Sequence, residues 1–585
     1  MSDVTLSVRD TILQTHGHLL ITGGPGSGKT TVALDKALQR ISSGLLPGQS
    51  VLFLSFSRAA VARLAEAATN QIPKALKDQL YLQTFHSFFW DVLRTHGYLL
   101  GAPKPLKILL PHNERVLSKG IKQSDKVAWT AWETRRRDLF LESGLIAFDL
   151  FAEKACELIL KSPHILELIS DHFPLIIVDE AQDTGEDAWS FIAALKDVCQ
   201  IICLADLEQQ IFDHLPGIGP ERIDAIKATL APAEVDLGQV NNRSPGTEIA
   251  VFAQDILNMT PRGAPYVGVG RLGYNPATGD MSKLLRMSIG MLIRAVRKRG
   301  ASRPDSLAIL APTGRDVAFI SAALTRAQKP VPHQIAFDEA SSILAARFAA
   351  FLLEPKTALD MAAQIAEAME LLADIEQSNG TASGLKANDQ YRKWAVTVRE
   401  GKTPRGNLFP AIRSIIEHFL SEAFTGEPVK DWLRVKAVIR GSSNSTVAGI
   451  AGLLDYLVAF NRGRRITNGL STLWTETGSY RGARAALDAA LAQDALLAGL
   501  ENPSGVHLMT VHRSKGKQFD GVIIVRRSTP IGPNQWRSSF IWRDDNQPYP
   551  RSRKILRVAI TRARKHVIIL DAVYPACPLL RGHVL

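Results

Sequence analysis

One short stretch near the N-terminus constrains this chain more than any other. Residues 23–30 read Gly-Gly-Pro-Gly-Ser-Gly-Lys-Thr and stand between an apolar run at 18–22 and a helical pattern at about 31–40. A strand, a glycine-rich loop and a helix in this order are typical of a P-loop, whose backbone N–H groups surround a phosphate. Glycine lets the backbone approach the phosphate without a Cβ in the way, and the helix N-terminus adds its positive dipole end.

The motif predicts roles for single residues. We expect Lys29 to reach the β- and γ-phosphates of a nucleotide, and the Thr30 hydroxyl to be a ligand of Mg²⁺. A chance glycine-rich turn is the alternative, and the flanking strand and helix patterns disfavour it. The predicted nucleotide site comprises Gly23, Gly24, Pro25, Gly26, Ser27, Gly28, Lys29, Thr30 and Thr31.

Two adjacent carboxylates follow another apolar run. Residues 175–178 read Leu-Ile-Ile-Val and predict a buried strand, which ends at Asp179 and Glu180. Charges beside a buried strand are costly unless they serve chemistry. Opposite a P-loop, Asp179 is the expected partner of Mg²⁺, and Glu180 is the candidate to orient and deprotonate the attacking water. A helix N-cap cluster is the alternative reading, which the P-loop disfavours.

Further polar residues follow neighbouring apolar runs. Ligands of open α/β sheets bind at the carboxyl ends of the strands. Gln209 comes after the run at 201–204 and is a neutral donor that suits a γ-phosphate sensor, while Arg243 stands just before a helix. His86 lies in the run at 81–88, and by itself it suits a satisfied core histidine equally well.

Composition sets the class of protein. A chain of 585 residues is too long for one core and predicts several domains. No apolar run reaches the roughly 18 residues of a membrane span, and four scattered cysteines indicate a reducing, cytoplasmic compartment. The formal net charge of +12 suits either a polyanionic partner or a solvated basic surface.

Seven motifs occur in an order that resembles one family. They read Gly-Pro-Gly-Ser-Gly-Lys-Thr at 24–30, Phe-Ser-Arg-Ala-Ala at 56–60, Thr-Phe-His-Ser-Phe at 84–88, Val-Asp-Glu-Ala-Gln-Asp-Thr at 178–184, Asn-Arg-Ser at 242–244, Met-Thr-Val-His-Arg-Ser-Lys-Gly at 509–516 and Val-Ala-Ile-Thr-Arg-Ala at 558–563. This set resembles the UvrD/Rep family of superfamily 1 DNA helicases, and the match runs from Gly23 to Arg564.

The resemblance implies an α/β fold with two RecA-like, parallel-sheet P-loop motor domains. ATP binds between them, and each carries an inserted helical subdomain. We expect the first motor domain at 1–90 and 171–260 around a helical insertion at 91–170, and the second at 261–341 and 503–585 around an insertion at 342–502.

The resemblance also implies functions for side chains. Arg243 and Arg562 would reach the γ-phosphate and stabilise the charge of the transition state. Positions near a single-stranded DNA track would be Ser57, Arg58, Thr84, His86, Thr510, His512 and Ser514. Phosphate contacts there would bind DNA independently of its sequence.

The chain departs from the family at several positions. Residues 213–217 replace an aromatic residue and Arg-Gly-Ala, so the aromatic platform that stacks bases is not matched. Gln518 replaces a glutamate, Arg-Ser-Arg-Lys at 551–554 replaces Glu-Glu-Arg-Arg, and Arg557 replaces a tyrosine. The family's catalytic residues are all present, whereas the residues for strand separation and for coupling are altered.

The resemblance therefore implies an ATP- and Mg²⁺-dependent translocase that moves 3′ to 5′ on single-stranded DNA and unwinds forked DNA. One alternative is a motor subunit that works with a separate nuclease in a repair or defence complex. Another is a clamp that remodels protein on DNA with little unwinding. RNA stays an alternative strand because phosphate contacts do not read the sugar.

Overall fold

The computed structural model describes residues 8–24, 26–56, 60–62, 64–65, 68, 78–118, 121, 125–206, 221–238, 243–299, 304–325, 330–335, 340–378, 382–455, 464–496, 504–532, 535–542 and 545–585. The chain forms two compact units. Unit 1 comprises residues 1–93, 152–337 and 498–585, and unit 2 comprises residues 94–151 and 338–497.

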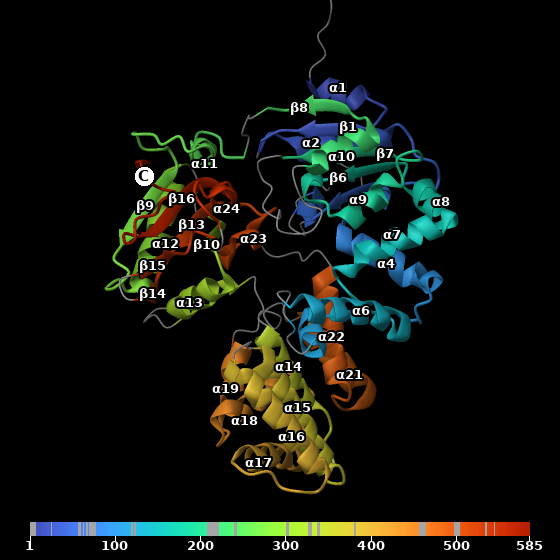
Figure 1. The fold of residues 1–585 in the computed structure, drawn as a ribbon, viewed down its shortest axis with the longest axis vertical. Helices are drawn as coiled ribbons and strands as arrows, with labels where there is room; N and C mark the ends of the chain where they lie inside the picture. Colours follow the sequence, from blue (N-terminus) through green and yellow to red (C-terminus); the bar gives the residue numbers. More distant parts are fainter. Residues whose placement is uncertain are drawn as a thin grey trace, which may run out of the picture. The chain divides into compact units, whose positions relative to one another are not determined.

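Unit 1 contains a first six-stranded sheet in which every strand pair is parallel (Figure 1). Its order is β3-β2-β6-β7-β1-β8. The strands are β1 (Leu19–Thr22), β2 (Val51–Ser55), β3 (Leu80–Thr84), β6 (Leu175–Val178), β7 (Gln200–Ala205) and β8 (Ala233–Asp236). The central strands are apolar on both faces, as expected of a parallel sheet that is covered on both sides.

Helices follow most of these strands. They are α1 (Val8–Gln14), α2 (Lys29–Ser42), α4 (Phe85–His96), α7 (Leu150–Lys161), α8 (Pro163–His172), α9 (Glu186–Ala193) and α10 (Glu221–Leu230), with a 3₁₀ turn, η3, at Ala181–Asp183. Buried residues of α1 and α2, among them Ile12 and Leu34, join one face of the sheet in a single core. The helix after the P-loop is therefore fixed to the sheet that bears it.

A second six-stranded parallel sheet has the order β11-β12-β10-β13-β16-β9. Its strands are β9 (Val269–Tyr274), β10 (Ser306–Ala311), β11 (Gln334–Ile335), β12 (Gly505–Thr510), β13 (Phe519–Arg526) and β16 (Ala563–Ala572). Helices α11 (Ile249–Asn258) and α24 (Pro550–Ile560) pack on one face, and α12 (Met281–Arg297) and α13 (Gly314–Thr325) pack on the other. Alternate residues of β10 point to the two faces, as strand geometry requires: Ala308 joins one core and Ile309 the other.

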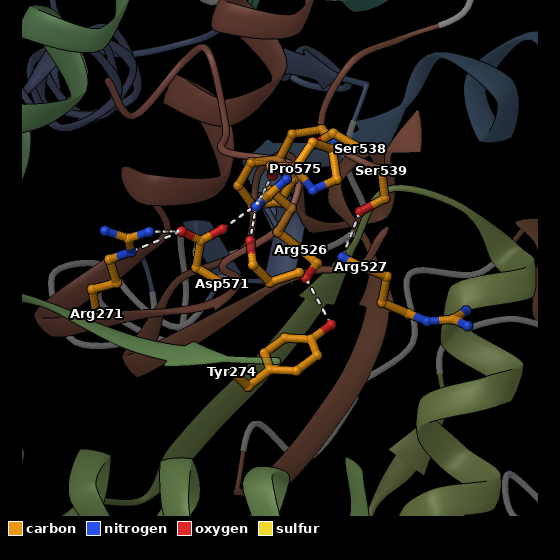
Figure 2. A network of polar contacts seen from close by, with 10 residues as sticks. Arg271, Tyr274, Arg526, Arg527, Ser538, Ser539, Asp571 and Pro575 are labelled. Carbon is orange, nitrogen blue, oxygen red and sulfur yellow. Dashed lines mark hydrogen bonds and ion pairs between the residues drawn. The ribbon is translucent and has the colours of Figure 1, made fainter. Parts of the chain in front are cut away.

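A polar network fastens the carboxyl ends of this sheet (Figure 2). Arg526 is fully buried, and its guanidinium pairs with Asp571 and donates to Ser538 Oγ at 3.0 Å. Asp571 also accepts from Arg271 Nε at 2.7 Å, and Tyr274 Oη donates to the Arg526 carbonyl at 3.1 Å. The network joins β9, β13 and β16 to the hairpin of β14 (Ser528–Gly532) and β15 (Gln535–Ser538), so its role is structural.

Unit 2 is mainly helical. Its elements are β4 (Lys107–Leu109), α5 (Pro111–Leu117), α6 (Lys126–Ser143), β5 (Leu145–Ala147), α14 (Ala340–Leu353), α15 (Met361–Ser378), α16 (Ala382–Arg399), α17 (Leu408–Ser421), α18 (Pro428–Arg440), α19 (Ser445–Asp455), α21 (Arg464–Thr477) and α22 (Ala483–Leu496). Helix α5 of the first insertion packs against α14 and α15 of the second. Residues 94–151 and 338–497 therefore share one compact unit.

The α/β class with two RecA-like parallel sheets is confirmed. Two details differ from the sequence analysis. Residues 261–279 contain edge strand β9, which was not predicted, and the apolar run at 81–88 is a strand only as far as Thr84, since helix α4 begins at Phe85. The glycine and arginine residues of β9 interrupt its apolar pattern. An edge strand tolerates them because its side chains are only partly buried.

Candidate functional site

The P-loop connects β1 to α2, and its glycines have backbone angles that other residues avoid. Gly23, Gly26 and Gly28 have φ values of 153°, 88° and 96°. A Cβ on Gly23 would lie 2.6 Å from Ser27 Oγ, whereas one on Gly28 would meet nothing within 4 Å. Gly23 is thus required for space, and Gly28 for its backbone conformation alone.

Lys29 begins α2 and turns its ammonium group into the loop. Its Nζ donates to the carbonyls of Gly23 at 2.6 Å and Gly24 at 3.0 Å. It also lies 3.8 Å from Asp206 Oδ2, at the carboxyl end of β7. The predicted phosphate-binding lysine therefore lies at the centre of the loop and beside a buried carboxylate.

The predicted carboxylates follow β6. Asp179 is buried, its N–H donates to the Leu54 carbonyl at 2.8 Å, and its Oδ2 accepts from Ser55 Oγ at 3.3 Å. Glu180 has φ 54° and ψ 43°, a left-handed conformation that is uncommon outside glycine. Such a conformation persists only where its surroundings hold it, and it is often found at functional sites.

The surroundings of Glu180 are polar and specific. Gln182 Nε2 donates to Glu180 Oε2 at 2.6 Å, and Gln182 Oε1 accepts from the Asp206 N–H at 3.1 Å. Burial alone would raise the pKa of Glu180, but the charges of Lys515 and Lys29 outweigh it and hold the pKa below its ordinary value. The bond from Gln182 adds to this effect. These surroundings favour the ionised form of the Glu180 carboxyl.

Two residues of this site were not singled out from the sequence. Lys515, between α23 (Val511–Ser514) and β13, forms a buried ion pair with Asp183. Burial raises the pKa of Asp183 to about 6, the charges of Glu180 and Asp206 raise it too, and Lys515 opposes them. Both residues lie inside motifs quoted above, but their pairing spans 332 positions and carries no local signal.

The two predicted arginines meet at Thr561. Arg243 Nη1 donates to the Thr561 carbonyl at 3.1 Å. Arg562 is buried, and its guanidinium donates to the Val558 carbonyl at 3.0 Å and to Thr561 Oγ1 at 3.1 Å. Arg562 is also near enough to Glu180 to lower the pKa of that carboxyl.

The residues present fit a nucleotide triphosphate with Mg²⁺. Ser27 Oγ is buried and has no hydrogen-bond partner in the described part of the chain, so the loop holds an unused polar group. A hydroxyl at Thr30 and a carboxylate at Asp179 are oxygen donors of the kind Mg²⁺ prefers. The described residues contain no cluster of three His, Cys, Asp or Glu side chains that could hold a metal ion.

The positions expected along a DNA track differ in their surroundings. Thr84 is buried and accepts from the Ser87 N–H at 3.1 Å, and Ser514 is buried and donates to the Val511 carbonyl at 2.6 Å. His86 is exposed, and Thr510 and His512 are half-buried. Pro25, Ser57, Arg58 and Gln209 lie outside the described residues, so these assignments stay predictions.

The first sheet carries a glycine-rich loop with its lysine and, after another parallel strand, two adjacent carboxylates. The domain of the second parallel sheet contributes Lys515 and Arg562 to the surroundings of these carboxylates. This arrangement defines the P-loop NTPase class with two RecA-like domains. Family models narrow this class. The UvrD/REP helicase N-terminal domain matches residues 5–142 and 137–216, and the UvrD-like helicase C-terminal domain matches residues 472–573. The chain belongs to the UvrD/Rep family of superfamily 1 ATP-dependent DNA helicases.

Curated relatives agree with the family models. The putative ATP-dependent DNA helicase YjcD of Bacillus subtilis is 23% identical over 97% of this chain and 78% of its own length. DNA helicase II of Escherichia coli is 23% identical, over 35% of this chain and 33% of that protein. PcrA of Staphylococcus aureus is 22% identical over 35% of this chain and 33% of its own length. Among the described helices, none is long and apolar enough to cross a membrane.

Proposed function

We propose that this protein hydrolyses ATP to move 3′ to 5′ along single-stranded DNA and to separate forked DNA. The observation that supports this most is the mixed origin of the charges around Glu180. Lys29 and Gln182 belong to the first sheet's domain, whereas Lys515 and Arg562 belong to the second. Because residues of both sheets' domains lower the pKa of this candidate base, hydrolysis would depend on how the two sheets are arranged.

Each side chain has a task in this mechanism. The P-loop amides and Lys29 would bind the phosphates of ATP, and Thr30 and Asp179 would hold Mg²⁺, which would supply positive charge for the phosphates. Glu180, held by Gln182, orients water and takes its proton. Arg243 and Arg562 supply cationic donors for the charge that develops at the γ-phosphate.

DNA would act on this site through the segment around Thr510 and His512. The segment continues directly into Lys515, which pairs with Asp183 three residues after Glu180. A strand that contacts His512 would therefore bias a loop that reaches the catalytic carboxylates. Basal hydrolysis should be slow and should rise strongly with single-stranded DNA.

The test compares two forked substrates with the full-length chain. Duplexes with a 3′ or a 5′ single-stranded tail are mixed with ATP and Mg²⁺, and the released strand is measured. The proposal expects release from the 3′-tailed duplex, none from the 5′-tailed duplex, and none with Glu180→Gln. An ATPase rate indifferent to DNA would remove the protein from the motor class.

The alternative of a motor subunit that works with a separate nuclease has its own outcome in this assay. It is supported by the family positions altered at 551–554 and 557. DNA-stimulated ATPase without strand release would favour that alternative or a protein-remodelling clamp. Strand release after addition of a nuclease that copurifies from the host would identify the motor subunit.

A further inference from the structure

An aromatic residue outside the nucleotide site lies in an unusual setting. Trp542 is half-buried between β15 and α24 and packs against the core beneath α11 and α24. Its backbone N–H donates to Ser552 Oγ at 2.9 Å, and the Ser552 N–H donates to Asp545 Oδ2 at 2.7 Å. Trp542 is thus fixed to the first turn of α24.

Two cationic or potentially cationic side chains contact the Trp542 ring. The His512 ring lies 5.2 Å from it, between centroids, at an interplanar angle of 59°. The Arg551 guanidinium lies 5.0 Å from the ring centroid. We call Trp542, His512 and Arg551 the Trp542 cluster; all three belong to the second sheet's domain within unit 1.

Arg551 differs from the other arginines that lie over aromatic rings in the described part of the chain. Each of the others also pairs with a carboxylate: Arg222 with Glu186, Arg262 with Glu248, Arg434 with Glu422, Arg484 with Glu354 and Arg527 with Asp316. No described carboxylate pairs with Arg551, and its buried Nε has no described hydrogen-bond partner. The Arg551 guanidinium therefore lies over the Trp542 ring without a described carboxylate to neutralise its charge.

The neighbouring charges add to this excess. Residues 551–554 carry Arg551, Arg553 and Lys554 in the first turn of α24, with no acidic residue in that turn. Arg553 is used within the fold, since its guanidinium donates to the Pro548 carbonyl at 2.7 Å and the Ile256 carbonyl at 2.8 Å. Asp545 already accepts from the helix backbone, and no carboxylate in the described part of the chain pairs with Arg551 or Lys554. Of these two cations, Arg551 is the one that lies over the Trp542 ring.

We propose that the Trp542 cluster binds single-stranded DNA, with Arg551 on a backbone phosphate and a base stacked against the Trp542 and His512 rings. The chemistry favours a strand because it offers phosphate and aromatic faces together, and stacking on aromatic residues binds bases without regard to sequence. The inference rests on the proposed function. It would supply a stacking contact in a chain whose residues 213–217 lack the family's aromatic platform.

The phosphate contact is tested with Arg551→Gln. Binding of a fluorescein-labelled oligothymidylate is measured by anisotropy over a range of salt concentrations. Loss of one phosphate contact should lower the slope of log K against log salt by about 0.7 in magnitude. Arg551→Lys should keep the slope, and the matched control Arg581→Gln removes the same charge from an exposed site without changing it. Equal slopes for Arg551→Gln and Arg581→Gln would overturn the phosphate contact.

The stacking contact is tested with an abasic oligomer of the same length. One lost stacked base is worth at least about a fivefold change in affinity. Trp542→Leu should therefore reduce the preference for oligothymidylate over the abasic strand about fivefold or more. Trp542→Phe keeps an aromatic ring and should retain part of the preference, so it separates the loss of stacking from a folding defect. An unchanged preference in folded Trp542→Phe and Trp542→Leu would overturn stacking. Failure of the wild-type chain to bind either oligomer would instead refute the proposed function.

Discussion

Gln182 offers the sharpest test of the catalytic base. Its side chain is buried and bridges Glu180 Oε2, at 2.6 Å, to the Asp206 N–H, at 3.1 Å. In Gln182→Met the side chain keeps its length but loses both bonds. A hydrogen bond to a charged group contributes about 1.5–3 kcal/mol. Its loss should raise the pKa of Glu180, because that bond helps to hold the pKa low.

The pH dependence follows from the sign of this shift. A base acts while it is ionised, so turnover is present above the pKa of Glu180 and is lost as the pH falls through it. Raising the pKa moves this loss to higher pH. On the acidic limb, the lost bond corresponds to about a ten- to hundredfold smaller ionised fraction. At higher pH, the rates of variant and wild type should converge.

The assay is steady-state ATPase activity in saturating single-stranded DNA as a function of pH. Gln200→Met is the matched control. Gln200 begins β7, at the strand end opposite Asp206, and its side chain donates to the Gly17 carbonyl at 2.7 Å. The same substitution there removes a hydrogen bond away from Glu180. ATP affinity should stay the same in both variants. Superimposable pH profiles for Gln182→Met and wild type would refute the assignment of Gln182 as the residue that positions Glu180.

Other changes test the remaining parts of the site. Lys29→Ala should abolish turnover, and Glu180→Gln should bind ATP without hydrolysing it; wild-type ATPase rates in either would overturn the assignment. Arg562→Lys should lose about 10³–10⁵ in rate, because lysine cannot replace a planar two-donor group, and a normal rate with DNA would refute the composite site. Replacing residues 342–502 by a Gly/Ser linker should retain DNA-stimulated ATPase, measured alongside circular dichroism, since the cores of the second sheet contain no residue of that block. Loss of folding would contradict this expectation.

Much of the site could be predicted because its residues lie in contiguous motifs at strand ends. Lys29 follows a loop whose glycines are demanded by φ values of 88° to 153°, and Glu180 directly follows an apolar strand. Such local patterns survive in a single sequence. The strand order β3-β2-β6-β7-β1-β8 then brings β1, β6 and β7 together, which the motif alone did not specify.

What the sequence did not reveal depends on distant pairing. Lys515 reaches Asp183 across 332 positions, and no spacing rule links them. The unit formed by residues 94–151 and 338–497 also depends on distant pairing, because α5 packs against α14 and α15. The pattern of neither segment alone indicates this contact. Edge strand β9 was missed because its glycine and arginine residues resemble loop composition.

The charges around Glu180 explain why hydrolysis should respond to the second sheet. Three carboxylates gather here, those of Glu180, Asp183 and Asp206, and two of them, Asp183 and Asp206, are buried, where unpaired charge is costly. Lys29 compensates from the first sheet's domain, and Lys515 from the second. Without the charge of Lys515, the burial that raises the pKa of Glu180 would be opposed only by Lys29, Gln182 and Arg562. We therefore propose that a DNA strand that shifts the segment from His512 to Lys515 changes the pKa of Glu180, and with it hydrolysis, without touching ATP.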